Sequence, residues 1–240
     1  SRLPDLVPAA LILLIEPIAG RHGAELTAVI VWPALLFAMA LALLADIARR
    51  LDGRPAAGLV ALLLGALAYP ATGLFMPGRI DHHALQLVLL LIAARAMLAE
   101  SRAGAGATTG LAIAASLAIG LESAPLSALI LAVLTIRWVT DGKGAVVVAA
   151  GAALGGATAL AAWLLAPRIW PAALCDAFTP PVAALGVAAG AILLVLGLAT
   201  RFLASWQRRL TALVLAGLAG LILSMFFAPA CLAGPYGAVP

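Results

Sequence analysis

An arginine, an aspartate and two histidines stand together at the start of one apolar segment of this sequence. The stretch reads Pro-Gly-Arg-Ile-Asp-His-His over residues 77–83 and continues into the apolar residues 84–91. An aspartate and a histidine two positions apart offer an oxygen and an imidazole nitrogen, which suit a divalent cation such as Mn²⁺, Mg²⁺ or Zn²⁺. Ionisable groups beside so apolar a segment are costly and mark functional sites. The stretch therefore predicts a metal site with Asp81 and His83 as ligands.

The same residues also admit a structural interpretation. An aspartate before a helix accepts hydrogen bonds from the first backbone N–H groups, and Asp81 fits that capping role as well as it fits a ligand role. Capping requires neither His82 nor His83, and this favours a functional cluster. Arg79 suits the binding of an anionic phosphate, although an arginine at a lipid-headgroup boundary is also ordinary.

Glu122 is a further candidate, because it lies between two apolar segments with no basic residue near it in the sequence. It is either a loop carboxylate in water or a carboxylate that projects into an external cavity shared with Asp81, and the sequence leaves both interpretations open. In the second case Glu122 has a catalytic role, orienting an acceptor or completing a metal shell. Arg21, His22 and Glu25 gather at another expected helix start, where a solvated loop is the simpler account.

The composition is that of an integral membrane protein. Of the 240 residues, 65% are hydrophobic and 10% are charged, whereas about 25% charged residues is usual in soluble proteins. The mean hydropathy is +1.17. The formal net charge is +4, but no basic run is longer than two arginines, so we expect no nucleic-acid partner.

Apolar runs long enough to cross a hydrocarbon core of about 30 Å recur along the chain and predict an all-α, polytopic transmembrane helical bundle. Residues 1–20, with three prolines and two acidic residues, form either a short span or an interfacial helix in an external loop, and the second is favoured. The bundle occupies 24–231 of a single transmembrane domain, 1–240. We expect about eight spans, at residues 24–47, 56–75, 83–99, 107–121, 123–139, 144–166, 182–199 and 210–230.

The basic residues predict one orientation for these spans. The loops at 46–54, 95–102, 137–143 and 201–209 hold ten of the fourteen Lys and Arg, which places them in the cytoplasm by the positive-inside rule. The opposite face gathers acidic residues and includes Asp81 and Glu122. We therefore expect the chemistry on the external face.

Small residues spaced four apart, as in Gly151–Gly155 and Gly186–Gly190, predict close packing of membrane helices. Cys175 and Cys231 both fall near expected external helix ends, and the sequence does not decide whether they pair. The chain begins with Ser1 and stops in a loop-like stretch, so we expect it to be a fragment of a longer protein.

The turn at Asp81 resembles the catalytic subunits of membrane oligosaccharyltransferases, within the GT-C class of multi-spanning glycosyltransferases that use polyprenyl-phosphate-linked sugars. In that family an external loop leading into a transmembrane helix carries an acidic motif of the type Asp-x-Asp, Asp-Asn-Glu or, in archaeal members, Asp-His-His. Here Asp81-His82-His83 precedes the apolar residues 84–91. The resemblance implies that Asp81 and His83 help bind a divalent metal, Mn²⁺ or Mg²⁺, that neutralises the donor pyrophosphate as the sugar leaves.

The resemblance leaves the site incomplete. The family has another catalytic aspartate that would precede the region present here. Its later metal-binding glutamate and its soluble acceptor-binding domain are also not in this sequence. Glu122 lies at a different helix junction, so that glutamate's role does not transfer to it.

The function expected from these features is that of a membrane glycosyltransferase that moves a sugar or oligosaccharide from a polyprenyl-phosphate-linked donor to an unknown acceptor. Asp81 and Glu122 would be catalytic, Asp81 and His83 would bind the metal, and Arg79 and His82 would bind substrate. The small-residue helices would hold the lipid tail. We expect the bacterial inner (plasma) membrane, with the active face periplasmic or external.

Two alternatives belong to other classes. In a secondary transporter or permease, Asp81, His82, His83 and Glu122 would be proton or ion sites. Transporters place such groups near the bilayer midplane on broken helices, often in two related halves, and no second half is visible here. A purely structural membrane subunit would not need the Asp81 cluster at all.

Overall fold

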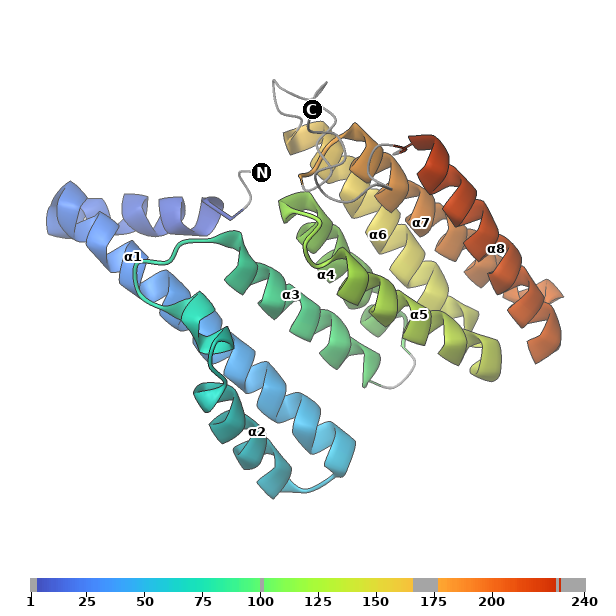
Figure 1. Cartoon of the computed structure of the whole chain (residues 1–240), viewed down its shortest axis with the longest axis horizontal. Coiled ribbons are helices and arrows are strands. Elements are labelled where there is room, and N and C mark those ends of the chain that lie inside the picture. Colours follow the sequence, from blue (N-terminus) through green and yellow to red (C-terminus); the bar gives the residue numbers. More distant parts are fainter. Residues whose placement is uncertain (1–3, 100–101, 166–176, 228, 230–240) are drawn as a thin grey trace. The chain divides into compact units, whose positions relative to one another are not determined.

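The computed structural model describes residues 4–99, 102–165, 177–227 and 229. Within them the regular secondary structure is entirely helical, as the sequence predicts, with eight α-helices and two short 3₁₀ helices (Figure 1). The chain divides into two compact units, an N-terminal unit of Arg2–Leu91 and a C-terminal unit of Ile92–Pro240. The expectation of one transmembrane domain over residues 1–240 stays a prediction.

The N-terminal unit is built on one long helix, α1 (Leu6–Asp52), which is broken at Gly20. Gly20 has a φ of 69° and a ψ of 168°, which glycine adopts without the clash that a Cβ would bring. This break agrees with the expected boundary after residue 20, but the chain turns there without a loop.

The second helix of this unit, α2 (Pro55–Leu67), runs back along α1 (Figure 1). A Cβ added to Gly65 would lie 3.1 Å from side-chain atoms of both Leu41 and Leu44, so the glycine lets α2 lie close against α1. The expected span over residues 56–75 is wrong, because the helix ends at Leu67. Pro70 has no backbone N–H and disfavours the helical conformation at the residue before it, so the chain continues only as the 3₁₀ helix η1 (Ala71–Phe75).

After η1 a polar turn leads to α3 (His82–Met97), which begins in the N-terminal unit. The remaining elements belong to the C-terminal unit: α4 (Ala103–Ile119), α5 (Ala124–Asp141), α6 (Gly144–Leu165), α7 (Pro180–Ala199), the 3₁₀ helix η2 (Thr200–Phe202) and α8 (Trp206–Phe227). Helix α6 packs against both α4 and α7, and α8 packs against α7 and α5 (Figure 1).

Glycines set the contact between α6 and α7. A Cβ added to Gly151 would lie 2.4 Å from the backbone nitrogen of Leu194, and one added to Gly190 would lie 2.4 Å from the backbone nitrogen of Gly155. Backbone therefore meets backbone across this interface, which only glycine permits. The close packing predicted from the small residues at these positions is confirmed.

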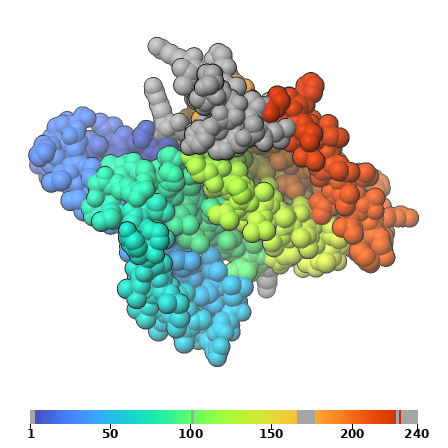
Figure 2. Space-filling view, viewed as in Figure 1, coloured from blue at the N-terminus to red at the C-terminus, as the bar shows by residue number. Residues whose placement is uncertain are grey.

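Five helices are long and apolar enough to cross a membrane, at Leu6–Asp52, Ala124–Asp141, Gly144–Leu165, Pro180–Phe202 and Trp206–Phe226. Three further apolar helices, α2, α3 and α4, are shorter. The chain is thus a multi-pass membrane protein, while the figure of eight spans stays a prediction. The most apolar stretch of α8 has no buried residue, and Figure 2 shows its side chains at the surface (red). Cys175 and Cys231 lie outside the described residues.

Candidate functional site

The polar turn of the N-terminal unit follows directly from η1. The Phe75 ring at the end of η1 contacts the Phe37 ring of α1, with centroids 5.2 Å apart. The chain then turns, and the Arg79 backbone N–H donates to the Met76 carbonyl at 3.0 Å. These contacts place the residues that follow, including Asp81, just beyond a segment that is packed on α1.

Arg79 and Asp81 form an ion pair across this turn. The Arg79 Nε donates to Asp81 Oδ2, and Nη1 donates to the Gly73 carbonyl at 3.4 Å. The Asp81 side chain is 25% exposed and that of Arg79 is 48% exposed. Arg79 was expected to face a phosphate, and the structure shows in addition that it orients the carboxylate of Asp81.

The other oxygen of Asp81 faces His83. The His83 backbone N–H donates to Asp81 Oδ1 at 3.2 Å, which is the capping contact that an aspartate before a helix offers. The His83 Nδ1 lies 3.6 Å from the same oxygen. Asp81 therefore caps α3. Its Oδ1 also lies near the imidazole nitrogen of His83, which capping does not require.

The distance between these two atoms fits a shared cation. At 3.6 Å, Oδ1 and Nδ1 are too far apart for a good direct hydrogen bond. Two ligand atoms that each lie about 2.0–2.2 Å from one ion are separated by roughly 3 Å at a right angle and about 4 Å when nearly opposite. The 3.6 Å separation lies between these two values, so small side-chain movements would bring both atoms into reach of one ion.

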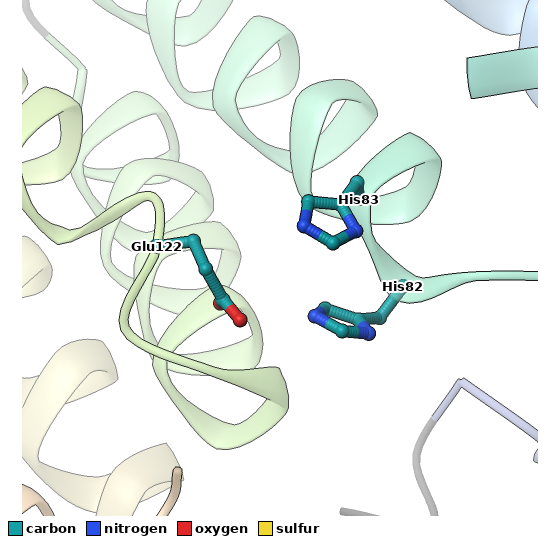
Figure 3. Close-up of side chains that lie close together, drawn as sticks. All are labelled: His82, His83 and Glu122. Carbon is teal, nitrogen blue, oxygen red and sulfur yellow. The ribbon is translucent and has the colours of Figure 1, made fainter. Parts of the chain in front are cut away.

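His82 and His83 lie next to each other at the start of α3. Their rings lie face to face (Figure 3), with centroids 4.3 Å apart and planes inclined by 27°. His82 therefore supports the ring of His83 on one side. A role for His82 in binding substrate stays a prediction.

The charges around Asp81 favour its ionised form. Partial burial works against ionisation, but the hydrogen bond and the charge of Arg79, with the charge and the backbone N–H of His83, outweigh it and hold the pKa of Asp81 below its ordinary value. A carboxylate kept ionised is ready to bind a cation without first losing a proton.

Comparison with protein-family models, with curated proteins and with solved structures finds no match to this chain. The likeness of Asp81-His82-His83 to the oligosaccharyltransferase motif therefore stays a resemblance of sequence.

Glu122 lies in the C-terminal unit, on the turn between α4 and α5 (Figure 3). It is exposed, and its carboxylate lies over Gly120, where an added Cβ would come within 2.3 Å of Glu122 Oε2. The adjacent Ser123 hydroxyl makes a buried hydrogen bond of 2.6 Å with the Ser116 hydroxyl. The turn therefore has a defined shape, and the catalytic role of Glu122 stays a prediction.

The cluster at Arg21 differs from its sequence interpretation. Arg21, His22 and Glu25 lie within α1 rather than in a solvated loop, because the helix resumes directly after Gly20. Arg21 Nε donates to Glu25 Oε1 one helical turn on, and Arg21 Nη1 lies 3.8 Å from Glu16. The Arg21–Glu25 pair runs along the helix surface, and the Arg21–Glu16 pair bridges the break at Gly20.

Sequence reasoning did not find two polar features of the C-terminal unit. One is the buried serine pair described above, and the other is Arg137 of α5, which donates to the Met97 carbonyl at the end of α3. Ser116 lies in α4 and Ser123 on the turn that follows it, so no helical periodicity reveals the pair. An arginine near a helix end gives a signal only of charge, not of its partner.

Proposed function

We propose that this chain is the membrane-embedded part of a glycosyltransferase that takes a sugar or oligosaccharide from a polyprenyl-phosphate-linked donor with the help of a divalent cation. The observation that carries the proposal is the 3.6 Å spacing of Asp81 Oδ1 and His83 Nδ1, with Arg79 on the other carboxylate oxygen. A pair of metal ligands beside an arginine is what a metal-bound pyrophosphate needs.

Asp81 and His83 would hold the cation, Mn²⁺ or Mg²⁺, through one oxygen and one nitrogen. When bound, the cation neutralises charge on the donor pyrophosphate as the sugar leaves. Arg79 keeps Asp81 ionised and aimed, and a guanidinium has five N–H donors, so its bonds to Asp81 and Gly73 still allow contact with a phosphate oxygen. The stacked ring of His82 fixes the orientation of His83 and presents an imidazole toward the substrate.

Glu122 is assigned to the acceptor. A carboxylate orients a nucleophilic hydroxyl or amide by accepting its hydrogen bond, and this role needs an exposed group such as Glu122. Completion of the metal shell by Glu122 is the other role that the sequence suggests. Glu122→Gln separates the two roles. If Glu122 orients the acceptor, metal affinity is unchanged in this variant; if it completes the metal shell, metal affinity falls.

The position of Asp81 favours an enzyme over a transporter. Asp81 directly precedes α3 and is not inside a helix, whereas ion-coupled transporters bind at breaks within spanning helices. The asymmetry of the basic residues supports a periplasmic or external active face, in a bacterial inner membrane.

The test is release or transfer of sugar from polyprenyl-pyrophosphate-linked and polyprenyl-phosphate-linked donors by the full-length protein in detergent or liposomes. Turnover is measured with Mn²⁺, with Mg²⁺ and with EDTA, for the wild type, for Asp81→Ala and for the matched control Glu25→Ala. We expect metal-dependent turnover that is lost with EDTA and in Asp81→Ala and retained in Glu25→Ala.

A wild type that is inactive across the donors, or an Asp81→Ala variant that turns over normally, would remove Asp81 as a catalytic ligand. In that case proton-coupled transport by the same residues is the next activity to measure, as substrate uptake into liposomes under an imposed pH gradient.

A further inference from the structure

Helix α1 contains a buried proline, Pro33, in the middle of its longer arm. In an α-helix the N–H of each residue bonds to the carbonyl four residues before it, and proline has no N–H to give. Pro33 therefore leaves the carbonyl of Val29 without its usual partner inside the helix. Because few backbone carbonyls in folded proteins stay unpaired, a donor from elsewhere is expected there.

The donor comes from the polar turn. The backbone N–H of Gly78 donates to the Val29 carbonyl at 3.3 Å. Gly78 has a φ of 91°, a conformation that residues with a side chain rarely adopt, although no atom lies within 4 Å of where its Cβ would be. Glycine is needed here for the backbone conformation and not for space.

This bond joins α1 to the residues that carry the site. Gly78 precedes Arg79 directly and Asp81 by three positions, and the Phe75–Phe37 ring contact holds the chain on α1 just before it. We propose that Pro33 is a positioning residue: by withholding its N–H it makes the Val29 carbonyl an anchor for Gly78, and this anchor aims Arg79 and Asp81. The value of the anchor to function rests on the function proposed above.

The same helix offers an internal comparison. Pro17 also lies inside α1, but it is exposed, and in the described part of the chain no other element donates a backbone hydrogen bond to Leu13, four residues before it. A proline in α1 does not by itself dock a loop. Pro17 is thus the matched control for Pro33.

The experiment uses the full-length protein and two pairs of variants. Pro33→Ala returns an N–H that competes with Gly78 for the Val29 carbonyl, and Pro17→Ala is its control. Gly78→Ala strains the turn while leaving α1 intact, and Gly53→Ala is its control, since Gly53 also has a positive φ and open space but follows the last residue of α1. Docking is read by hydrogen–deuterium exchange of the peptide covering residues 76–81, and the site by Mn²⁺ titration followed by electron paramagnetic resonance.

We expect faster exchange over residues 76–81 and about tenfold weaker Mn²⁺ binding in Pro33→Ala, with both unchanged in Pro17→Ala. Alanine is a better helix former than proline, so a loss that came from unfolding of α1 is not expected, and an unchanged melting temperature checks this. Gly78→Ala should weaken Mn²⁺ binding to a similar degree, and Gly53→Ala should not.

Two results would overturn the inference, and they differ from a failure of the proposed function. Faster exchange with unchanged Mn²⁺ affinity in Pro33→Ala would show that the anchor does not aim the site. Unchanged exchange would show that Gly78 is not anchored at Val29. A wild type that binds no Mn²⁺ would instead remove the metal site itself, and with it the positioning role.

Discussion

Two stretches of the N-terminal unit carry nearly the same side chains and use them differently. One has Arg21 and Glu25 with a histidine between them, and the other has Arg79 and Asp81 followed by two histidines. In the first, arginine and carboxylate pair along the surface of α1, with side chains 65% and 46% exposed. In the second, the carboxylate is 25% exposed and also faces the backbone N–H and the ring of His83.

The difference lies in the backbone. Inside a helix, residues four apart meet on the surface, and the N–H groups are occupied by carbonyls of the helix itself. At a helix start the first N–H groups are unoccupied and point at a preceding carboxylate. The turn before α3 thus brings Asp81 Oδ1 close to both the backbone N–H and the ring of His83. In α1 the same residue types form only a surface ion pair. The same residue types therefore form different arrangements, because their place inside a helix or before its start decides which side chains come together.

The largest expected contrast is between the histidines. His83→Ala should weaken Mn²⁺ binding by about 10- to 100-fold, since it removes the imidazole nitrogen that we propose as a metal ligand beside Asp81 Oδ1. His22→Ala should leave Mn²⁺ affinity unchanged. Calorimetric titration of the two variants against the wild type measures both. Equal losses in the two variants would mean that the Asp81 turn is no more a metal site than the surface of α1.

A smaller contrast is expected between the arginines. Arg79→Gln should raise the KM for the donor about tenfold at saturating Mn²⁺, because it removes the proposed charge-assisted contact to phosphate and the hydrogen bond that orients Asp81. Arg21→Gln removes only an exposed pair along a helix, which contributes about 0–1 kcal/mol to stability, and should leave KM unchanged. Arg79→Lys should recover part of the loss. An unchanged KM in Arg79→Gln would mean that Arg79 only orients Asp81 and does not bind the donor.

The smallest effect is a pH-dependent one on stability. The pKa of Asp81 is lowered from 3.8 in the folded chain, so its ionised form stabilises the fold above that value, and the contribution disappears as pH falls through the folded pKa. In EDTA, the wild type should melt about 2–4 °C above Asp81→Asn from pH 7 to pH 5, corresponding to about 1 kcal/mol. The gap should close below pH 3.8. The control variant Glu25→Gln should melt like the wild type, and a gap that grows toward low pH would contradict the sign.

Much of the fold is predictable from the sequence because long apolar runs leave few alternatives. The start of α5 and α6 and the glycine contacts between α6 and α7 follow from apolar length and small-residue spacing. The end of α2 at Leu67 does not, since the residues around it are as apolar as those of a span. There the backbone restriction of Pro70 overrides hydropathy, and a window average does not register one proline.

The candidate site is predictable in part for a similar reason. Asp81 and His83 are two residues apart, so local geometry brings them together, and their capping contact follows from the sequence. The contact of Gly78 with Val29 joins residues that are far apart in the chain, and it depends on an N–H that Pro33 lacks. A missing donor leaves no mark in a hydropathy pattern. The link between Pro33 and Gly78 therefore becomes visible only in the structure.

The length of α1 relates the site to the thickness of the bilayer. From Arg21 to Asp52 the helix is about 48 Å long, whereas its apolar part, residues 26–45, spans about 30 Å, which matches the hydrocarbon core. The charged last turns, where Asp46 pairs with two arginines, are then long enough to reach the headgroup layer of a bilayer of that thickness. Because Val29 lies near the opposite end of the apolar part, a thinner or thicker membrane would move the anchored turn relative to the lipid phosphates.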